Sequence, residues 1–161
     1  MKRLLTIAAI AALLIGCTAQ QPAPVVEDNT PGFVLSDENV EVKIGEDGAL
    51  LSLINKETGH NYASGEGLWR MFYNTHEEKE MQIDGTENTP EVSQEGDVII
   101  ITYKDIVHRG KALKMGLTLT VKVEDGAVRF GSEVSNNEPG TIIRELQYPL
   151  VGNMNLPEGH K

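Results

Sequence analysis

Histidines and clustered carboxylates are the residues of this chain whose types could support acid–base or metal chemistry. His76 is followed by Glu77, Glu78 and Glu80 in the segment HEEKE, and such carboxylates could attract a hard cation such as calcium. The segment lacks the alternating Asp and Asn ligands around a glycine that are typical of a calcium loop. We therefore interpret it as a solvated charged loop and expect no metal and no cofactor. No close ligand spacing links the four histidines, which are His60, His76, His108 and His160.

The other acid–base candidates lie on or beside expected strands. They are His108, Arg109, Glu133 and Glu145. A glycosidase holds two carboxylates on opposite sides of the bond that it cleaves, and nothing in the sequence places any two of these residues at such a separation. Arg144 and Glu145 are neighbours on one expected strand, so we expect them to point to opposite faces. The chain has no Gly-x-Ser-x-Gly elbow, and we name no catalytic residue.

The N-terminus has the pattern of an export signal. Basic residues at positions 2 and 3 precede an apolar run from Leu4 to Ile15 that only Thr6 interrupts. A basic start followed by a short apolar segment indicates a secretory signal peptide. The run is shorter than the roughly 20 residues that a membrane-spanning helix needs. The alternative is a short N-terminal anchor helix.

The end of this segment, Leu14-Ile15-Gly16-Cys17, resembles the lipobox of bacterial lipoproteins. The resemblance implies lipid attachment to Cys17 after removal of residues 1–16. Thr18, in place of aspartate, favours sorting to the outer membrane in such lipoproteins. We expect an exported protein that the Cys17 lipid anchors to the cell envelope, since two or more acyl chains anchor stably.

Composition divides the remaining chain into a tether and one domain. Residues 17–32 are proline-rich and polar, which is typical of an extended spacer. Residues 33–161 have the length of a single domain. Cys17 is the only cysteine, so the mature chain cannot form an internal disulfide. The net charge of −10 argues against nucleic acid as a partner, because phosphates would be repelled.

The domain shows strand-like patterns throughout. Apolar and polar residues alternate in several short segments, and no helical period is sustained. The turn sequence Glu-Asp-Gly occurs at 46–48 and again at 124–126, where glycine tolerates a positive φ. We predict an all-β, antiparallel β-sandwich. The expected strands are 39–44, 49–55, 67–74, 97–105, 117–123, 127–135 and 141–150.

The segment GLWRMFYN, residues 67–74, concentrates the aromatic residues of the chain. If it is a strand, Trp69 and Tyr73 share one face and Phe72 lies on the other. Large apolar groups on both faces favour an interior strand that is covered on both sides. The alternative is that Trp69 or Tyr73 contacts a carbohydrate, since both rings combine an apolar face with a polar group.

Several segments together resemble the N-terminal galactose-mutarotase-like β-sandwich of bacterial glycoside hydrolases. They are 48–59, 68–70, 136–137 and 148–150, and the resemblance spans about residues 38–154. In that family the sandwich precedes a catalytic (β/α)₈ barrel, which carries the catalytic carboxylates. Nothing in this sequence corresponds to the barrel. The resemblance therefore implies an incomplete, non-catalytic sandwich related to glycoside hydrolases, with an oligo- or polysaccharide as its partner.

Two other functions stay open at this point. One is a small mutarotase-like or glycosidase enzyme assembled from His108, Glu133 and Glu145. The other is a non-catalytic envelope protein that binds a protein partner through an exposed sheet edge.

Overall fold

The computed structural model describes residues 30–63 and 67–152, and nearly all of their regular structure is antiparallel strand. The predicted all-β, antiparallel sandwich is therefore confirmed as a fold class. A single 3₁₀ turn, Gly85–Glu87, interrupts the strands of this part. The strands are β1 (Gly32–Ser36), β2 (Val40–Gly45), β3 (Leu50–Asn55), β4 (Arg70–Asn74), β5 (Met81–Asp84), β6 (Glu91–Glu95), β7 (Val98–Tyr103), β8 (Val107–His108), β9 (Lys111–Ala112), β10 (Met115–Glu124), β11 (Ala127–Asn136) and β12 (Ile142–Gln147).

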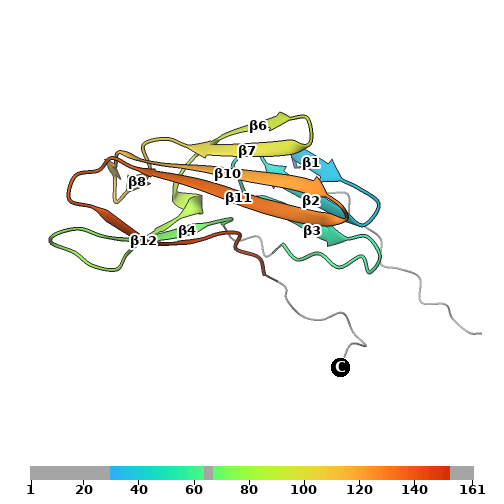
Figure 1. Cartoon of the computed structure of the whole chain (residues 1–161), viewed down its shortest axis with the longest axis horizontal. Helices are drawn as coiled ribbons and strands as arrows, with labels where there is room; N and C mark the ends of the chain where they lie inside the picture. Colours follow the sequence, from blue (N-terminus) through green and yellow to red (C-terminus); the bar gives the residue numbers. More distant parts are fainter. Residues whose placement is uncertain (1–29, 64–66, 153–161) are drawn as a thin grey trace, which may run out of the picture.

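The strands form two layers. One layer is a four-stranded sheet in the order β11-β10-β7-β6. The other layer consists of two three-stranded sheets, β1-β2-β3 and β12-β4-β5, which lie towards opposite ends of the long axis (Figure 1). The small β8-β9 hairpin lies at the same end as β12 and β4.

The inner face of the four-stranded sheet supplies much of the core. Leu117 and Leu119 on β10 face inward and pair with Tyr103 and Ile101 on β7, and all four are buried. Strict alternation puts Thr118 and Thr120 on the outer face. Each fully buried Leu or Ile contributes about 1.5–3 kcal/mol relative to an exposed position. The alternation therefore determines which face of the sheet packs against the core.

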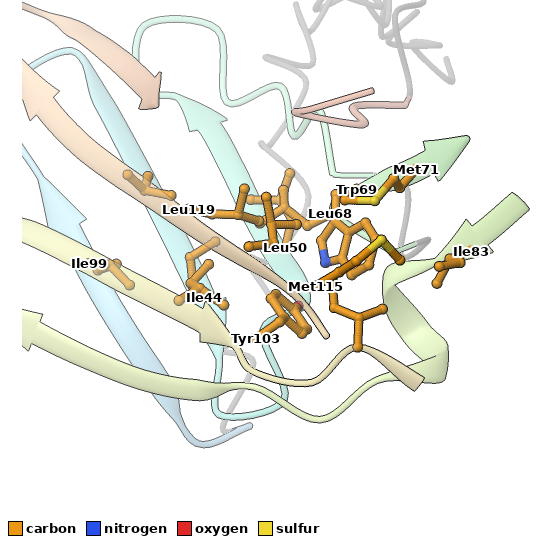
Figure 2. Close-up of a cluster of buried hydrophobic side chains, with 14 of the residues drawn as sticks. Ile44, Leu50, Leu68, Trp69, Met71, Ile83, Ile99, Tyr103, Met115 and Leu119 are labelled. Atoms are coloured by element: carbon orange, nitrogen blue, oxygen red, sulfur yellow. The ribbon is translucent and has the colours of Figure 1, made fainter. Parts of the chain in front are cut away.

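Trp69 belongs to the core between the layers. It is 0% exposed, and its ring packs edge-on against Tyr103 with centroids 5.1 Å apart. Figure 2 shows it among buried side chains from several strands, with Met71 and Ile83 on one side and Leu50 and Leu68 on the other. The interpretation of Trp69 as a core residue agrees with this position.

The expectation that this strand is covered on both faces was wrong. β4 is the central strand of its sheet, and its inner face carries the buried Met71 and Tyr73. Phe72, on the outer face, is only half-buried, as are Arg70 and Asn74 beside it. The outer face of the β12-β4-β5 sheet is thus open to solvent along β4.

The expectation that Arg144 and Glu145 point to opposite faces was also wrong. Strand β12 has a register shift against β4 between Ile143 and Glu145. A β-bulge places two residues opposite one and breaks the alternation of side chains. Arg144 and Glu145 consequently line the same cleft on the outer face of the sheet.

The lipoprotein predictions concern residues outside the described part. The signal peptide at 1–16, Cys17 and most of the tether at 17–32 fall there, and the first described strand begins at Gly32. Within residues 30–63 and 67–152, no helix is long and apolar enough to span a membrane.

Two hairpin turns differ in how closely the core approaches them. Gly48 follows β2 with φ +79°, and a Cβ there would lie 2.7 Å from the Tyr103 hydroxyl and 2.8 Å from Pro90 Cγ. Gly96, between β6 and β7, has φ +61°, and a Cβ there would meet no heavy atom within 4 Å beyond its chain neighbours. Of these two turns, only the one at Gly48 therefore combines a left-handed backbone with a packed neighbourhood.

We predict that Gly48→Ala destabilises the domain more than Gly96→Ala. A left-handed alanine costs about 1–2 kcal/mol, which both variants incur. The clash with Tyr103 and Pro90 adds about 1–3 kcal/mol in Gly48→Ala alone. Urea unfolding followed by Trp69 fluorescence measures both values, and equal losses would contradict the packing of Gly48 against Tyr103.

Candidate functional site

A cleft of about 510 Å³ opens at one end of the sandwich. Three loops form it: the β4–β5 loop, the β8-β9 hairpin and the β11–β12 turn, which Figure 1 shows at the same end. We call it the end cleft. Most of its lining residues have side chains that form hydrogen bonds, and these include both positively and negatively charged groups. The lining residues are Tyr73, Thr75, His76, Glu77, Glu78, Met81, His108, Arg109, Lys111, Leu113, Glu138, Pro139, Gly140 and Thr141.

The β8-β9 hairpin positions two of these residues. His108 pairs with Lys111 across a two-residue turn, Arg109-Gly110, in which both residues have positive φ, +50° and +76°. Positive φ at both central positions is the hallmark of a type I′ turn, whose twist matches that of the flanking strands. The tight turn leaves His108 buried while Arg109 and Lys111 extend into solvent.

His108 is the buried polar residue of the site. Its side chain is 8% exposed, and neither Nδ1 nor Nε2 has a hydrogen-bond partner among the described residues. Its ring meets that of Tyr73 edge-on, with centroids 5.7 Å apart. A buried polar atom without a partner costs about 1–3 kcal/mol, so the position of this imidazole is energetically unfavourable.

An ion pair lies at the rim beside His108. Arg109 Nη1 donates to Glu78 Oε2 at 3.0 Å, and both side chains are exposed. These two residues and His108 also line another cleft, of about 620 Å³, to which residues 79–82 contribute as well. An exposed pair contributes at most about 1 kcal/mol, so it can open at little cost and widen access to His108.

Glu138 is held more firmly. Its Oε1 accepts a hydrogen bond from Lys111 Nζ at 3.0 Å, and its Oε2 accepts one from the Lys114 backbone N–H at 2.9 Å. These bonds, the backbone bond first, hold the pKa of the Glu138 carboxyl below its ordinary value. Glu138 is therefore a carboxylate near neutral pH, and it can accept hydrogen bonds from a ligand but does not serve as an acid.

Tyr73 forms part of the cleft floor rather than an exposed platform. It is 2% exposed, and burial raises the pKa of its hydroxyl, although the nearby Arg109 opposes this rise. Trp69 lies deeper and is fully buried, so neither of the two predicted carbohydrate contacts offers a free ring face. Stacking of a sugar on Trp69 would require the core to open.

The structure separates the three residues of the enzymatic alternative. His108 lines the end cleft, and Glu145 lines the cleft on the outer face of the β12-β4-β5 sheet. Glu133 pairs with Thr118, on the solvent side of the four-stranded sheet. The expected combination of His108, Glu133 and Glu145 into one site was therefore wrong.

Sequence reasoning missed the residues that the end cleft does bring together. His76 and His108 are 32 positions apart and line the same cleft, together with Glu138. The segment HEEKE contributes His76, Glu77 and Glu78 to its wall, and no group of metal ligands occurs in the described part of the chain. The only local sequence feature that could have pointed to this site is the Arg109-Gly110 pair, because it is compatible with a tight hairpin that orients His108.

Comparisons of the chain with protein-family models, with curated proteins and with solved structures found no significant match. The resemblance to the galactose-mutarotase-like sandwich thus stays a prediction. The antiparallel sandwich fits that family, and it fits many others, because one fold supports unrelated functions.

We predict that the Glu138 carboxyl titrates below an ordinary glutamate in the folded protein. A depressed pKa stabilises the fold at pH values above the ordinary range, and this contribution disappears as the pH falls through the folded pKa. In Lys111→Ala the pKa should rise only part of the way, because the Lys114 N–H still donates to Oε2. Carboxyl ¹³C NMR titration checks both, and an ordinary value in the wild type would contradict the two bonds.

Proposed function

We propose that this protein is a membrane-anchored exported lipoprotein whose β-sandwich binds carbohydrate without catalysing a reaction on its own. Its relation would be to the N-terminal, non-catalytic part of a glycoside hydrolase-like protein. The lipobox at Cys17 supports the lipid anchor and the location in the envelope. Metabolic labelling of the protein with a lipid precursor tests this attachment. The antiparallel sandwich supports the domain type.

The observation that carries the proposal is the pair of unpartnered nitrogens of His108 at the end cleft. A neutral imidazole has one N–H donor and one acceptor nitrogen. A sugar hydroxyl both donates and accepts, so it can bond to either nitrogen once the Arg109–Glu78 pair at the rim opens. Binding would then offset part of the cost of burying this imidazole without a hydrogen-bond partner.

The rest of the end cleft suits the same ligand. Glu138 offers carboxylate lone pairs to donating hydroxyls, and Arg109 and Lys111 offer N–H groups to accepting ones. No full charge is left over on these two residues, because each cation already has a carboxylate partner. Glu77 adds a third carboxylate to the lining, so a neutral saccharide matches the end cleft better than an anionic ligand does.

A protein partner at a sheet edge is the second candidate function. Strand β12 is an edge of its sheet, and Ile142 on it is 64% exposed. An exposed edge strand with a large apolar side chain can pair with a strand of another chain. Cross-linking in intact cells through a photoreactive residue at position 142 tests this function.

We predict that His108→Phe abolishes glycan binding and raises stability. Phenylalanine keeps a planar ring against Tyr73 and removes both unpartnered nitrogens, which should add about 1–3 kcal/mol to the free energy of unfolding. Affinity for a neutral glycan found in a panel screen should fall at least about tenfold, which corresponds to about 1.4 kcal/mol. Calorimetry measures the binding, and urea unfolding measures the stability.

His60→Phe is the matched control, because His60 does not line the end cleft. It makes the same substitution and should leave the glycan affinity unchanged. Equal affinities of His108→Phe and the wild type would overturn the assignment of the site. If the wild type bound none of a broad panel of neutral glycans, the proposed carbohydrate-binding function would be overturned.

A further inference from the structure

A second cleft, of about 670 Å³, lies on the outer face of the β12-β4-β5 sheet, and we call it the face cleft. We propose that it binds a sugar that carries a carboxylate, a uronic acid residue of an acidic saccharide. Its lining residues are Phe72, Asn74, Lys79, Glu80, Arg144 and Glu145. The face cleft lies across β4 from Tyr73, so this inference does not depend on binding at the end cleft.

Two unpaired cations are the first observation behind this inference. Lys79 and Arg144 both line the face cleft, and neither has an ion pair or a side-chain hydrogen bond within residues 30–63 and 67–152. The chain has 24 acidic and 14 basic residues, so carboxylates outnumber cations. Six other cations of the described part do find carboxylates, namely Arg70, Lys104, Arg109, Lys111, Lys122 and Arg129. Lys56 and Lys114 form no such ion pair in that part of the chain, but neither of them lines the face cleft. Two free positive charges in one cleft of such a protein fit an anionic group of a ligand.

The backbone around these cations is specialised. The β-bulge of β12 turns Arg144 to the same side as Glu145. At the other wall Glu80 has φ +57°, and its N–H donates to Asn74 Oδ1 at 2.8 Å. Asn74 therefore fixes the end of the β4–β5 loop that carries Lys79. Bulges and left-handed residues often re-aim side chains at functional sites.

The remaining lining distinguishes a uronic acid from a polyanion. Glu80 and Glu145 would repel closely spaced phosphates or sulfates, but they can accept hydrogen bonds from hydroxyls. Glu145 Oε1 already accepts a bond from Gln147 Nε2 at 2.8 Å, which holds this carboxylate in place. Phe72 offers a half-buried ring to the apolar side of a pyranose. One carboxylate on a hydroxyl-rich ring satisfies all of these groups.

The test compares two forms of one saccharide by calorimetry on the full chain. Short oligogalacturonates and oligomannuronates present the carboxylate, and their methyl esters keep the ring and the hydroxyls but lose the charge. We expect at least one acid form to bind about tenfold or more tightly than its ester. The difference should shrink as salt is raised, because the exposed charges are then screened.

Variants then assign this binding to the face cleft. Arg144→Gln should lower the affinity for the acid form towards that of the ester, and the double variant Lys79→Gln/Arg144→Gln should lower it to the level of the ester. Lys104→Gln is the matched control, since it removes one exposed positive charge on another strand connection and should change the affinity less than about twofold. Phe72→Leu should weaken the acid and the ester alike. Trp69 fluorescence confirms that each variant is folded.

Equal binding of acid and ester, no binding of either acid form, or equal effects of Arg144→Gln and Lys104→Gln would each overturn the inference. His108→Phe separates it from the neutral-glycan site. That variant should leave uronate affinity unchanged, whereas loss of uronate binding in it would place the ligand in the end cleft and overturn the assignment to the face cleft.

Discussion

Burial of Trp69 between the two layers is the constraint on which the rest of the structure depends. Its carbonyl accepts a hydrogen bond from the Gly85 N–H at 2.9 Å, and its ring packs against Tyr103 of the opposite sheet. A Cβ at Gly85 would lie 2.8 Å from Trp69 Nε1, so the turn after β5 must carry a glycine to approach the indole. With Trp69 fixed inward, the alternation of β4 is fixed as well. A slip by one residue would turn every side chain of that strand to the wrong face.

The direction in which each side chain of β4 points decides which residues line each cleft. Tyr73 is directed to the inner side, where it meets His108 at the floor of the end cleft. Phe72 is directed to the outer side and lines the face cleft. The β4–β5 loop then supplies Glu78 to one cleft and Lys79 to the other. A single core residue thereby sets the geometry of two sites that lie on opposite sides of one strand.

The sequence predicts the central strands well, because burial on one face imposes an alternation that can be read directly. The segments that became β2 and β10 are of this kind, whereas β7 is recognised by its run of β-branched residues. It does not predict β6, whose sequence Glu-Val-Ser-Gln-Glu is almost wholly polar, because an edge strand buries few of its side chains. The bulge at Arg144 could not be predicted from the sequence either, because it depends on how β12 pairs with β4. The same holds for the end cleft, because His76 comes from the β4–β5 loop and His108 from β8.

Unpartnered buried nitrogens occur in this protein both in the core and at the end cleft. In the described part of the chain such side-chain atoms are Trp69 Nε1 and the two ring nitrogens of His108. Trp69 packs edge-on against Tyr103 without a hydrogen bond of good geometry, and the apolar contacts of a fully buried indole offset the loss of one bond. His108 gains much less, because its small ring lies at a cleft and leaves both a donor and an acceptor unsatisfied. An apolar residue would make the fold more stable at this position, and this is the reason why we propose a ligand for the imidazole.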